Sequence, residues 1–546
     1  MLGLTFEAVR SCAQPKTQNI YTGSEFIFYT KINVFLFRQP SIKIQDLIQK
    51  FPHLPEKIFQ KLDLESLFKC RAVARLWQNI IDGKNYPWLR LVNIPKILTN
   101  GNTYIHLAAA TGQIQTFKTA LSKEEDINVK NEAGQTSLHL ACMDGRFEIV
   151  QLLLKNAYLE IDPKSTDYHA INLSAKTEIN NATFHLASQK GHLDVIEILM
   201  ENAANLIVDL NAKDAKGKTG FIWACNHGHL EVVKIFLENA IDLRIDLNSK
   251  CDNGGTAFIW ACNDGHSDVV KIIMENTATF SFDLNAKDTN IGRTAFLWAC
   301  NHTDVVKIFM ENATNSGIDL NTSDNVGLTA FHIACNEGSA DLIRIFMENA
   351  ATLNIDLNAR DNDGMTAFHI ACNQGNTDVV KIFIEKAVTL DIDLNIRDND
   401  GMTGFHLACI CHPDLVNTIM KNVAILSFDL NTKDNLGWTA FHHVCNLGIS
   451  DVVQIFMRNA TALSIDLNTK SIDGLTAFHL ACYKGHSDMI KIFMANSVPL
   501  SIDLNIDSNN GMTAFFIACQ RGYSDVVKIF LDNTAALSID PNSKLK

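Results

Sequence analysis

The sequence predicts an all-α solenoid of about twelve helix–turn–helix units with hairpin loops, preceded by a small helical module. Three observations support this fold class. The phrase Gly-x-Thr-Ala-Phe-His-x-Ala-Cys recurs along the chain, mostly at intervals of 35 to 38 residues, which is the period of repeat architectures. Each copy is followed by apolar residues at helical spacing and then by a run of turn formers. A chain of 546 residues is also too long for one compact core, so an elongated array is expected.

The units align on a threonine that recurs twelve times. These threonines are Thr103, Thr136, Thr183, Thr219, Thr256, Thr294, Thr329, Thr366, Thr403, Thr439, Thr476 and Thr513. One interval is 47 residues long and carries an insert around 162–180, while the segments 300–306 and 409–416 are shortened. At such irregular units we expect the array either to bend or to split into subdomains.

Local rules predict the parts of one unit. Thr366 is suited to cap a first helix, and Gly375 should end it. A second helix should begin near Asp378, where a carboxylate favours a positive helix N-terminus. An Asn follows many second helices, and we expect a left-handed C-cap there. Examples are Asn239, Asn312 and Asn349.

The last part of the unit, residues 393–401, is rich in Asp, Asn and Gly and should project as a hairpin finger. One such unit cannot enclose its own apolar face. Each copy must therefore stack on its neighbours, so that stability becomes a sum over adjacent units.

The repeated phrase resembles that of the ankyrin repeat family, as in 474-GLTAFHLACYKGH-486, and the resemblance covers residues 99–546. It implies a protein-binding scaffold without catalysis. The chain departs from the family pattern by a Cys in the phrase and by about four extra residues in most units, as in 241–248. These extra residues either extend the second helix or bulge the loop.

Ten cysteines share one repeat position: Cys142, Cys225, Cys262, Cys300, Cys335, Cys372, Cys409, Cys445, Cys482 and Cys519. Equivalent atoms of stacked helices lie about 8–10 Å apart, beyond disulfide reach, so buried thiols in a reducing compartment are expected. A His three residues before the Cys, as in His369 and Cys372, raises the possibility of a metal site or a Cys–His nucleophile. Neither has the ligands or the oxyanion hole it needs. The family resemblance instead implies that this His bonds the Thr and the neighbouring backbone. We expect no cofactor, metal or catalytic residue.

Charge and hydropathy limit the partners. The chain has 47 Lys and Arg against 60 Asp and Glu, and the excess of acid falls in residues 99–546, which makes nucleic acid an unfavourable ligand. No run is long enough for a membrane helix, and no secretory signal is evident. A cytoplasmic or nuclear protein is therefore expected, without membrane insertion.

Residues 41–98 form a separate helical module, and residues 1–40 stay unassigned. The segment 51–91 carries apolar residues on short helices but is too small for an independent core. It resembles an F-box, which implies binding to the adaptor of a cullin-RING ubiquitin ligase. The matching residues are Leu54, Pro55, Ile58, Phe59, Leu62, Leu67, Val73, Trp77 and Trp88. Alternatively, the segment only caps the first ankyrin unit.

A candidate partner site lies at the residue between Gly and Thr, which we call the tip residue. It is large and apolar in six consecutive units: Leu328, Met365, Met402, Trp438, Leu475 and Met512. These residues form an exposed binding stripe, or each packs on the next finger and is only half exposed. The family resemblance adds the ends of the first helices: Glu337, Gln374, Leu447, Lys484 and Arg521. A ladder of Trp223, Trp260 and Trp298 is interpreted as core packing, with a binding strip as the alternative.

These features predict a protein-binding adaptor that is not an enzyme. Its function would be substrate recognition for a Skp-cullin-F-box type ubiquitin ligase, with residues 51–91 on the adaptor and the repeats on an unknown protein substrate. The alternative is an ankyrin scaffold that tethers a cytoskeletal, signalling or membrane protein.

Overall fold

The computed structural model describes residues 101–121, 126–159, 182–203, 208–423 and 428–537. The predicted module 41–98 and the unassigned segment 1–40 lie outside these ranges. The chain divides into two compact units, Met1–Glu178 and Ile179–Lys546. The division falls in the insert around 162–180. Of the two alternatives for this irregular interval, the split into subdomains is therefore the one observed.

The described residues contain twelve helix pairs, which confirms the repeat number. The first helices are α7 (Tyr104–Thr111), α9 (Ser137–Met143), α11 (Thr183–Lys190), α14 (Gly220–Asn226), α16 (Ala257–Asn263), α19 (Ala295–Ala299), α21 (Ala330–Glu337), α23 (Ala367–Gln374), α25 (Gly404–Cys411), α28 (Ala440–Leu447), α30 (Ala477–Lys484) and α32 (Ala514–Arg521). The second helices are α8 (Ile114–Leu121), α10 (Phe147–Leu159), α12 (Leu193–Glu201), α15 (Leu230–Asn239), α17 (Ser267–Glu275), α20 (Thr303–Ser316), α22 (Ala340–Leu353), α24 (Thr377–Lys386), α26 (Pro413–Met420), α29 (Ser450–Asn459), α31 (Ser487–Asn496) and α33 (Ser524–Leu537). A further short helix, α18 (Thr277–Phe280), follows α17.

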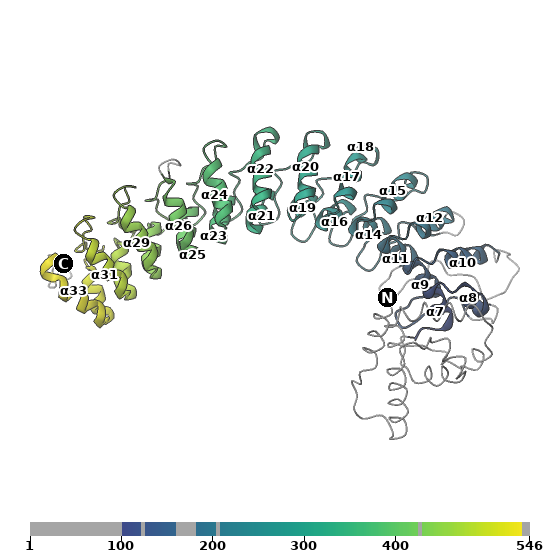
Figure 1. The fold of residues 1–546 in the computed structure, drawn as a ribbon, viewed down its shortest axis with the longest axis horizontal. Coiled ribbons are helices and arrows are strands. Elements are labelled where there is room, and N and C mark those ends of the chain that lie inside the picture. Colours follow the sequence, from purple (N-terminus) through teal and green to yellow (C-terminus); the bar gives the residue numbers. More distant parts are fainter. Residues whose placement is uncertain (1–100, 122–125, 160–181, 204–207, 424–427, 538–546) are drawn as a thin grey trace, which may run out of the picture. The chain divides into compact units, whose positions relative to one another are not determined.

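Within the second unit, the first helices form one layer and the second helices another (Figure 1). Apolar packing interlocks the repeats. The Phe383 ring on α24 lies 5.4 Å from Phe368 of its own repeat and 5.6 Å from Phe331 of the preceding one. All three rings are almost fully buried. Across the described ranges the fingers form turns and isolated β-bridges but no strand.

A histidine clamp joins successive repeats. Nδ1 of His369 accepts the backbone N–H of Thr366 at 3.1 Å and is hydrogen-bonded to the Thr366 hydroxyl at 2.9 Å. Nε2 therefore carries the ring proton, and it donates to the Met402 carbonyl of the next repeat at 3.1 Å. This confirms the role expected from the family resemblance. The same bond between repeats joins His106 to Gln135, His332 to Met365, His442 to Leu475 and His479 to Met512.

The four extra residues form a second clamp. In some repeats they prolong the second helix, as in α22, and in others they form helical turns, so both predicted alternatives occur. The segment ends at a left-handed residue such as Asp391, with φ 53°. Asn358 of the preceding repeat donates its Nδ2 to the Asp391 carbonyl and accepts the Asp393 N–H, both at 2.9 Å. The extra residues therefore present backbone groups to the neighbouring repeat.

Two local predictions are wrong. Asn239, Asn312 and Asn349 lie inside their helices, and each donates its side-chain N–H to the carbonyl four residues before it. The left-handed turn comes later because the extra residues continue the helical path. In the third unit, Ala182 and not Thr183 occupies the N-cap position. Phe184 and His185 directly follow Thr183 and are buried like the Phe and His of the other units. The N-cap of this first helix therefore lies one residue before the threonine.

A glycine follows most of the first helices, α19 and α25 excepted, and at Gly375 it makes room for the next repeat. Gly375 has φ 74° and caps α23, as predicted. A Cβ at this position would collide with the His412 ring. Nε2 of His412 donates to the Asn373 carbonyl at 2.8 Å. Gly375 thus allows both the left-handed turn and the close approach of His412.

Gly375→Ala should destabilise the junction between α23 and α26 more than Gly522→Ala destabilises the last repeat. Both sites have left-handed backbone, which costs a side chain about 1 kcal/mol, but a Cβ at Gly522 has no neighbour within 4 Å. The collision with His412 should add about 1–3 kcal/mol. Native-state hydrogen exchange of the α25 and α26 amides would measure the loss. Equal local effects in the two variants would contradict this packing account.

The clamp histidines should make stability depend on pH. Burial lowers the pKa of His442 and His479 to about 4, against about 6.5 in an unfolded chain. Between these values the unfolded state binds more protons, so the free energy of unfolding should fall as pH drops from about 6.5 to 4. The free energy of unfolding, measured by urea titration at several pH values in this range, should change less steeply with pH in His442→Gln/His479→Gln than in wild type. An unchanged slope would show that these rings are not buried as neutral groups.

Candidate protein-binding surface

The tip residues are held by their backbone while their side chains lie at the surface. The Met402 N–H donates to the Asp398 carboxylate at 2.8 Å, and its carbonyl accepts the His369 bond. All six predicted tip residues, from Leu328 to Met512, are half-buried. Their burial matches the alternative in which the stripe is only half exposed, and their role in binding stays a prediction.

More exposed apolar side chains lie at the outer turn of the finger, which the sequence analysis missed. The side chains of Val326, Leu436 and Ile472 are 57%, 59% and 66% exposed. Val326 and Leu436 directly precede the finger glycine, where other units carry Asp363 or Asp400. Ile472 lies one residue earlier, where other units carry Asn362 or Asn399. The apolar residue at this turn was the available sequence signal. It is easily passed over because the equivalent position is polar in neighbouring units.

The first helices end in exposed residues whose character changes along the array. All five positions expected from the family resemblance are exposed: Glu337, Gln374, Leu447, Lys484 and Arg521. Tyr483, which was not predicted, is 40% exposed, and the Arg521 guanidinium lies 3.7 Å from its ring centroid. The face therefore runs from acidic at Glu337 to apolar and basic at Tyr483 and Arg521.

The tryptophan ladder is half-buried instead of filling the core. The indole N–H of Trp223 donates to Asp214 at 3.0 Å, and that of Trp298 donates to Asp288 at 3.0 Å. An indole N–H requires such a partner when it leaves water, which draws each ring toward its own finger. The buried Lys218 ammonium lies 3.4 Å from the Trp260 ring centroid, and burial lowers its pKa.

The repeated cysteines are inert except at the end of the array. Nine are buried, and burial raises their pKa values, to about 12 for Cys300. A thiol of raised pKa is a poor nucleophile. Cys519 was expected to be buried as well but is exposed, because no described repeat follows to cover it. Cys411, at the end of α25, is also exposed and donates to the Asn373 side chain.

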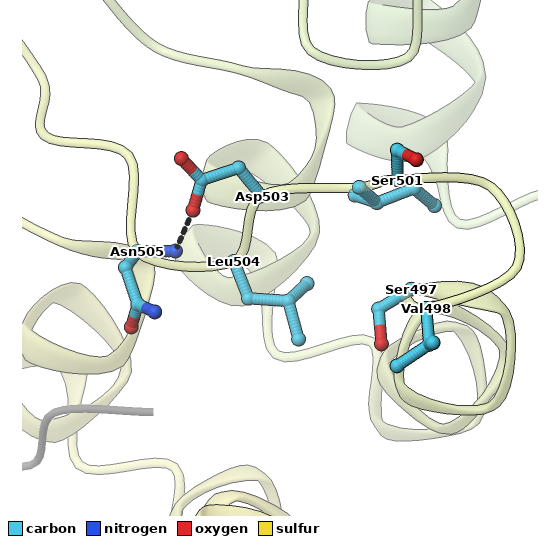
Figure 2. Close-up of a pocket in the computed structure, with 7 residues that line it drawn as sticks. Ser497, Val498, Ser501, Asp503, Leu504 and Asn505 are labelled. Carbon is cyan, nitrogen blue, oxygen red and sulfur yellow. Dashed lines mark hydrogen bonds between the residues drawn. The ribbon is translucent and has the colours of Figure 1, made fainter. Parts of the chain in front are cut away.

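The described ranges contain no group of three or more His, Cys, Asp or Glu placed to hold a metal ion. The cavity drawn in Figure 2, lined by residues 497–505, has a volume of about 170 Å³. Pockets for small molecules usually start near 300 Å³. Within the described part of the chain, no helix is long and apolar enough to span a bilayer.

Comparison with known proteins defines the class. A model of ankyrin repeats matches residues 80–167, 184–287, 243–324, 277–361, 315–398, 352–434 and 459–544. The chain therefore belongs to the ankyrin repeat family. An F-box domain model matches residues 54–89, ahead of the helix pairs described above. All nine predicted adaptor-binding residues, from Leu54 to Trp88, fall within this match but outside the described residues. Together the two families indicate a protein-binding adaptor.

Two curated relatives share short segments with the chain. One is "Probable E3 ubiquitin-protein ligase XBOS33" of Oryza sativa subsp. japonica, 45% identical over 53 residues, or 10% of each chain. The other is "Protein phosphatase 1 regulatory subunit 27" of Homo sapiens, 34% identical over 65 residues, or 12% of this chain and 42% of that protein. The matches span less than half of either relative.

Thiol labelling should separate the exposed cysteines from the buried ones. In the native protein, maleimide should modify Cys411 and Cys519 quickly and the nine stacked cysteines only after unfolding, because labelling requires an accessible thiolate. Peptide mass spectrometry would read each site, and Cys411→Ser provides the control. Rapid native labelling of Cys372 or Cys445 would contradict the described packing.

Proposed function

We propose that this chain is the substrate-recognition subunit of a cullin-RING ubiquitin ligase. The observation that carries the proposal is the F-box match at 54–89 beside an ankyrin array. The first module would bind the ligase adaptor, and the array would bind the protein to be modified. The local similarity to a probable E3 ubiquitin-protein ligase agrees with this assignment.

The chain would contribute proximity. The cysteine that transfers ubiquitin would belong to other subunits of the ligase. Holding substrate beside an activated group raises its effective concentration. A repeat array with fixed register suits this role, because its exposed side chains keep their positions when a partner binds.

The alternative is a scaffold in which the segment 51–91 only covers the first repeat. The two functions differ in one measurable property, which is binding of the ligase adaptor. A scaffold would tether its partner without the adaptor, whereas a ligase subunit would bind both.

The test is co-expression of the full chain with the ligase adaptor, followed by size-exclusion chromatography. Wild type should co-elute with the adaptor, and Leu54→Ala/Pro55→Ala/Trp77→Ala should not, because truncating buried anchors typically costs more than 1 kcal/mol each. A matched variant, Leu447→Ala, alters only the array and should retain the adaptor.

Failure of wild type to co-elute, with an array of normal helical content, would leave the scaffold function. Co-elution that persists in the triple variant would place the adaptor contact elsewhere in the chain.

A further inference from the structure

Exposed apolar side chains gather where the ninth, tenth and eleventh repeats adjoin. We define the apolar patch as Leu436, Leu447, Ile472 and Tyr483. Leu447 is 49% exposed, and the other three range from 40% to 66%. Single exposed apolar residues are ordinary on a protein surface, but several in adjacent repeats mark an interaction site.

The finger and helix parts of the patch belong to one face. The Trp438 ring, which follows the ninth finger, lies 5.1 Å from the His443 ring on α28. Leu447 follows His443 by four residues and so lies on the same side of that helix. Tyr483 lies in the last turn of the adjacent helix α30, and α30 packs beside α28. The patch thus extends from two finger turns to two helix ends.

The charge beside the patch opposes that of the array. Residues 99–546 carry an excess of acid, with Asp264 and Glu337 exposed at the ends of earlier first helices. Among the described first helices only α21 contains a carboxylate, that of Glu337. The last two, α30 and α32, end in Lys484 and Arg521, as α11 ends in Lys190. These cations also suit a helix C-terminus, but the earlier ends at Asn336 and Glu337 do not follow that rule.

The cations are accessible. Lys484 and Arg521 are both exposed. Arg521 stacks on Tyr483 at 3.7 Å, which holds its guanidinium in place and leaves its N–H groups available to a carboxylate. Acidic side chains of the fingers, such as Asp400 and Asp473, lie on the other side of the patch. An acidic ligand would therefore be attracted to the helix ends and repelled from the fingers.

We propose that the apolar patch with Lys484 and Arg521 binds an acidic segment of a partner protein that carries an aromatic or large aliphatic anchor. The anchor lies over Leu447 and Tyr483, and the acidic residues lie over Lys484 and Arg521. The acidic surface of the earlier repeats prevents such a segment from binding in another register. This inference rests on the proposed substrate-binding function of the array and names the chemistry of its ligand.

The test is selection of random twelve-residue peptides displayed on phage against the full chain. The selected peptides should be enriched in Asp and Glu beside Leu, Phe or Trp. A synthetic copy of a selected peptide should bind Lys484→Glu/Arg521→Glu at least about tenfold more weakly, which corresponds to about 1.4 kcal/mol. The matched control is Lys491→Glu/Lys528→Glu, which makes the same charge change at exposed positions of α31 and α33 and should leave binding unchanged.

Charge exchange provides a second measurement. A peptide with Lys in place of its acidic residues should bind the reversed variant more tightly than it binds wild type. The inference would be overturned if the selection enriches no peptides or enriches basic ones. It would also be overturned if the two double variants bind the selected acidic peptide with the same affinity. Adaptor co-elution measured on the same proteins separates the two proposals. If the adaptor still binds but no acidic peptide is selected, only the proposed docking site is overturned. If acidic peptides are selected but the adaptor does not bind, only the ligase function is overturned.

Discussion

The structure depends on the fact that no single repeat can bury its own apolar face. Phe383 needs Phe331 from the repeat before it and Phe368 from its own. Apolar packing of this kind is strong but lacks direction. Register between repeats therefore comes from polar clamps, namely the His369 bond to the Met402 carbonyl and the bonds of Asn358 to the following extra segment.

The predictable part of the fold is the part that local chemistry decides. Thr366, Gly375 and Asp378 act within one helix pair, and each has its expected place. The N-cap prediction at Thr183 was wrong within its own unit, whereas the other wrong predictions involve a neighbouring repeat. The left-handed turn lies at Asp391 and not at the helix Asn because the extra segment must reach Asn358. Cys519 is exposed on α32, the last of the described first helices. Contacts between repeats cannot be predicted from the sequence of a single unit.

The sequence predicts where the candidate surface lies better than it predicts which of its side chains are exposed. Tip residues such as Met402 attract notice as a recurring apolar position, yet they are half-buried, since their backbone is held between Asp398 and His369. Exposed apolar groups such as Leu436 and Ile472 occur only in some units. Buried positions repeat because every repeat packs in the same way. Exposed positions vary, and this variation gives one face an acidic region at Glu337 and a basic one at Arg521.

The central claim is that one chain holds a ligase adaptor and an acidic protein segment at the same time. Mass photometry of the full chain, the adaptor and a carrier protein that displays a selected acidic peptide tests this claim directly. The account predicts a ternary complex whose affinity for the peptide equals that of the chain alone, since separate modules bind the two partners. Two binary complexes that exclude each other, with no ternary species, would contradict it.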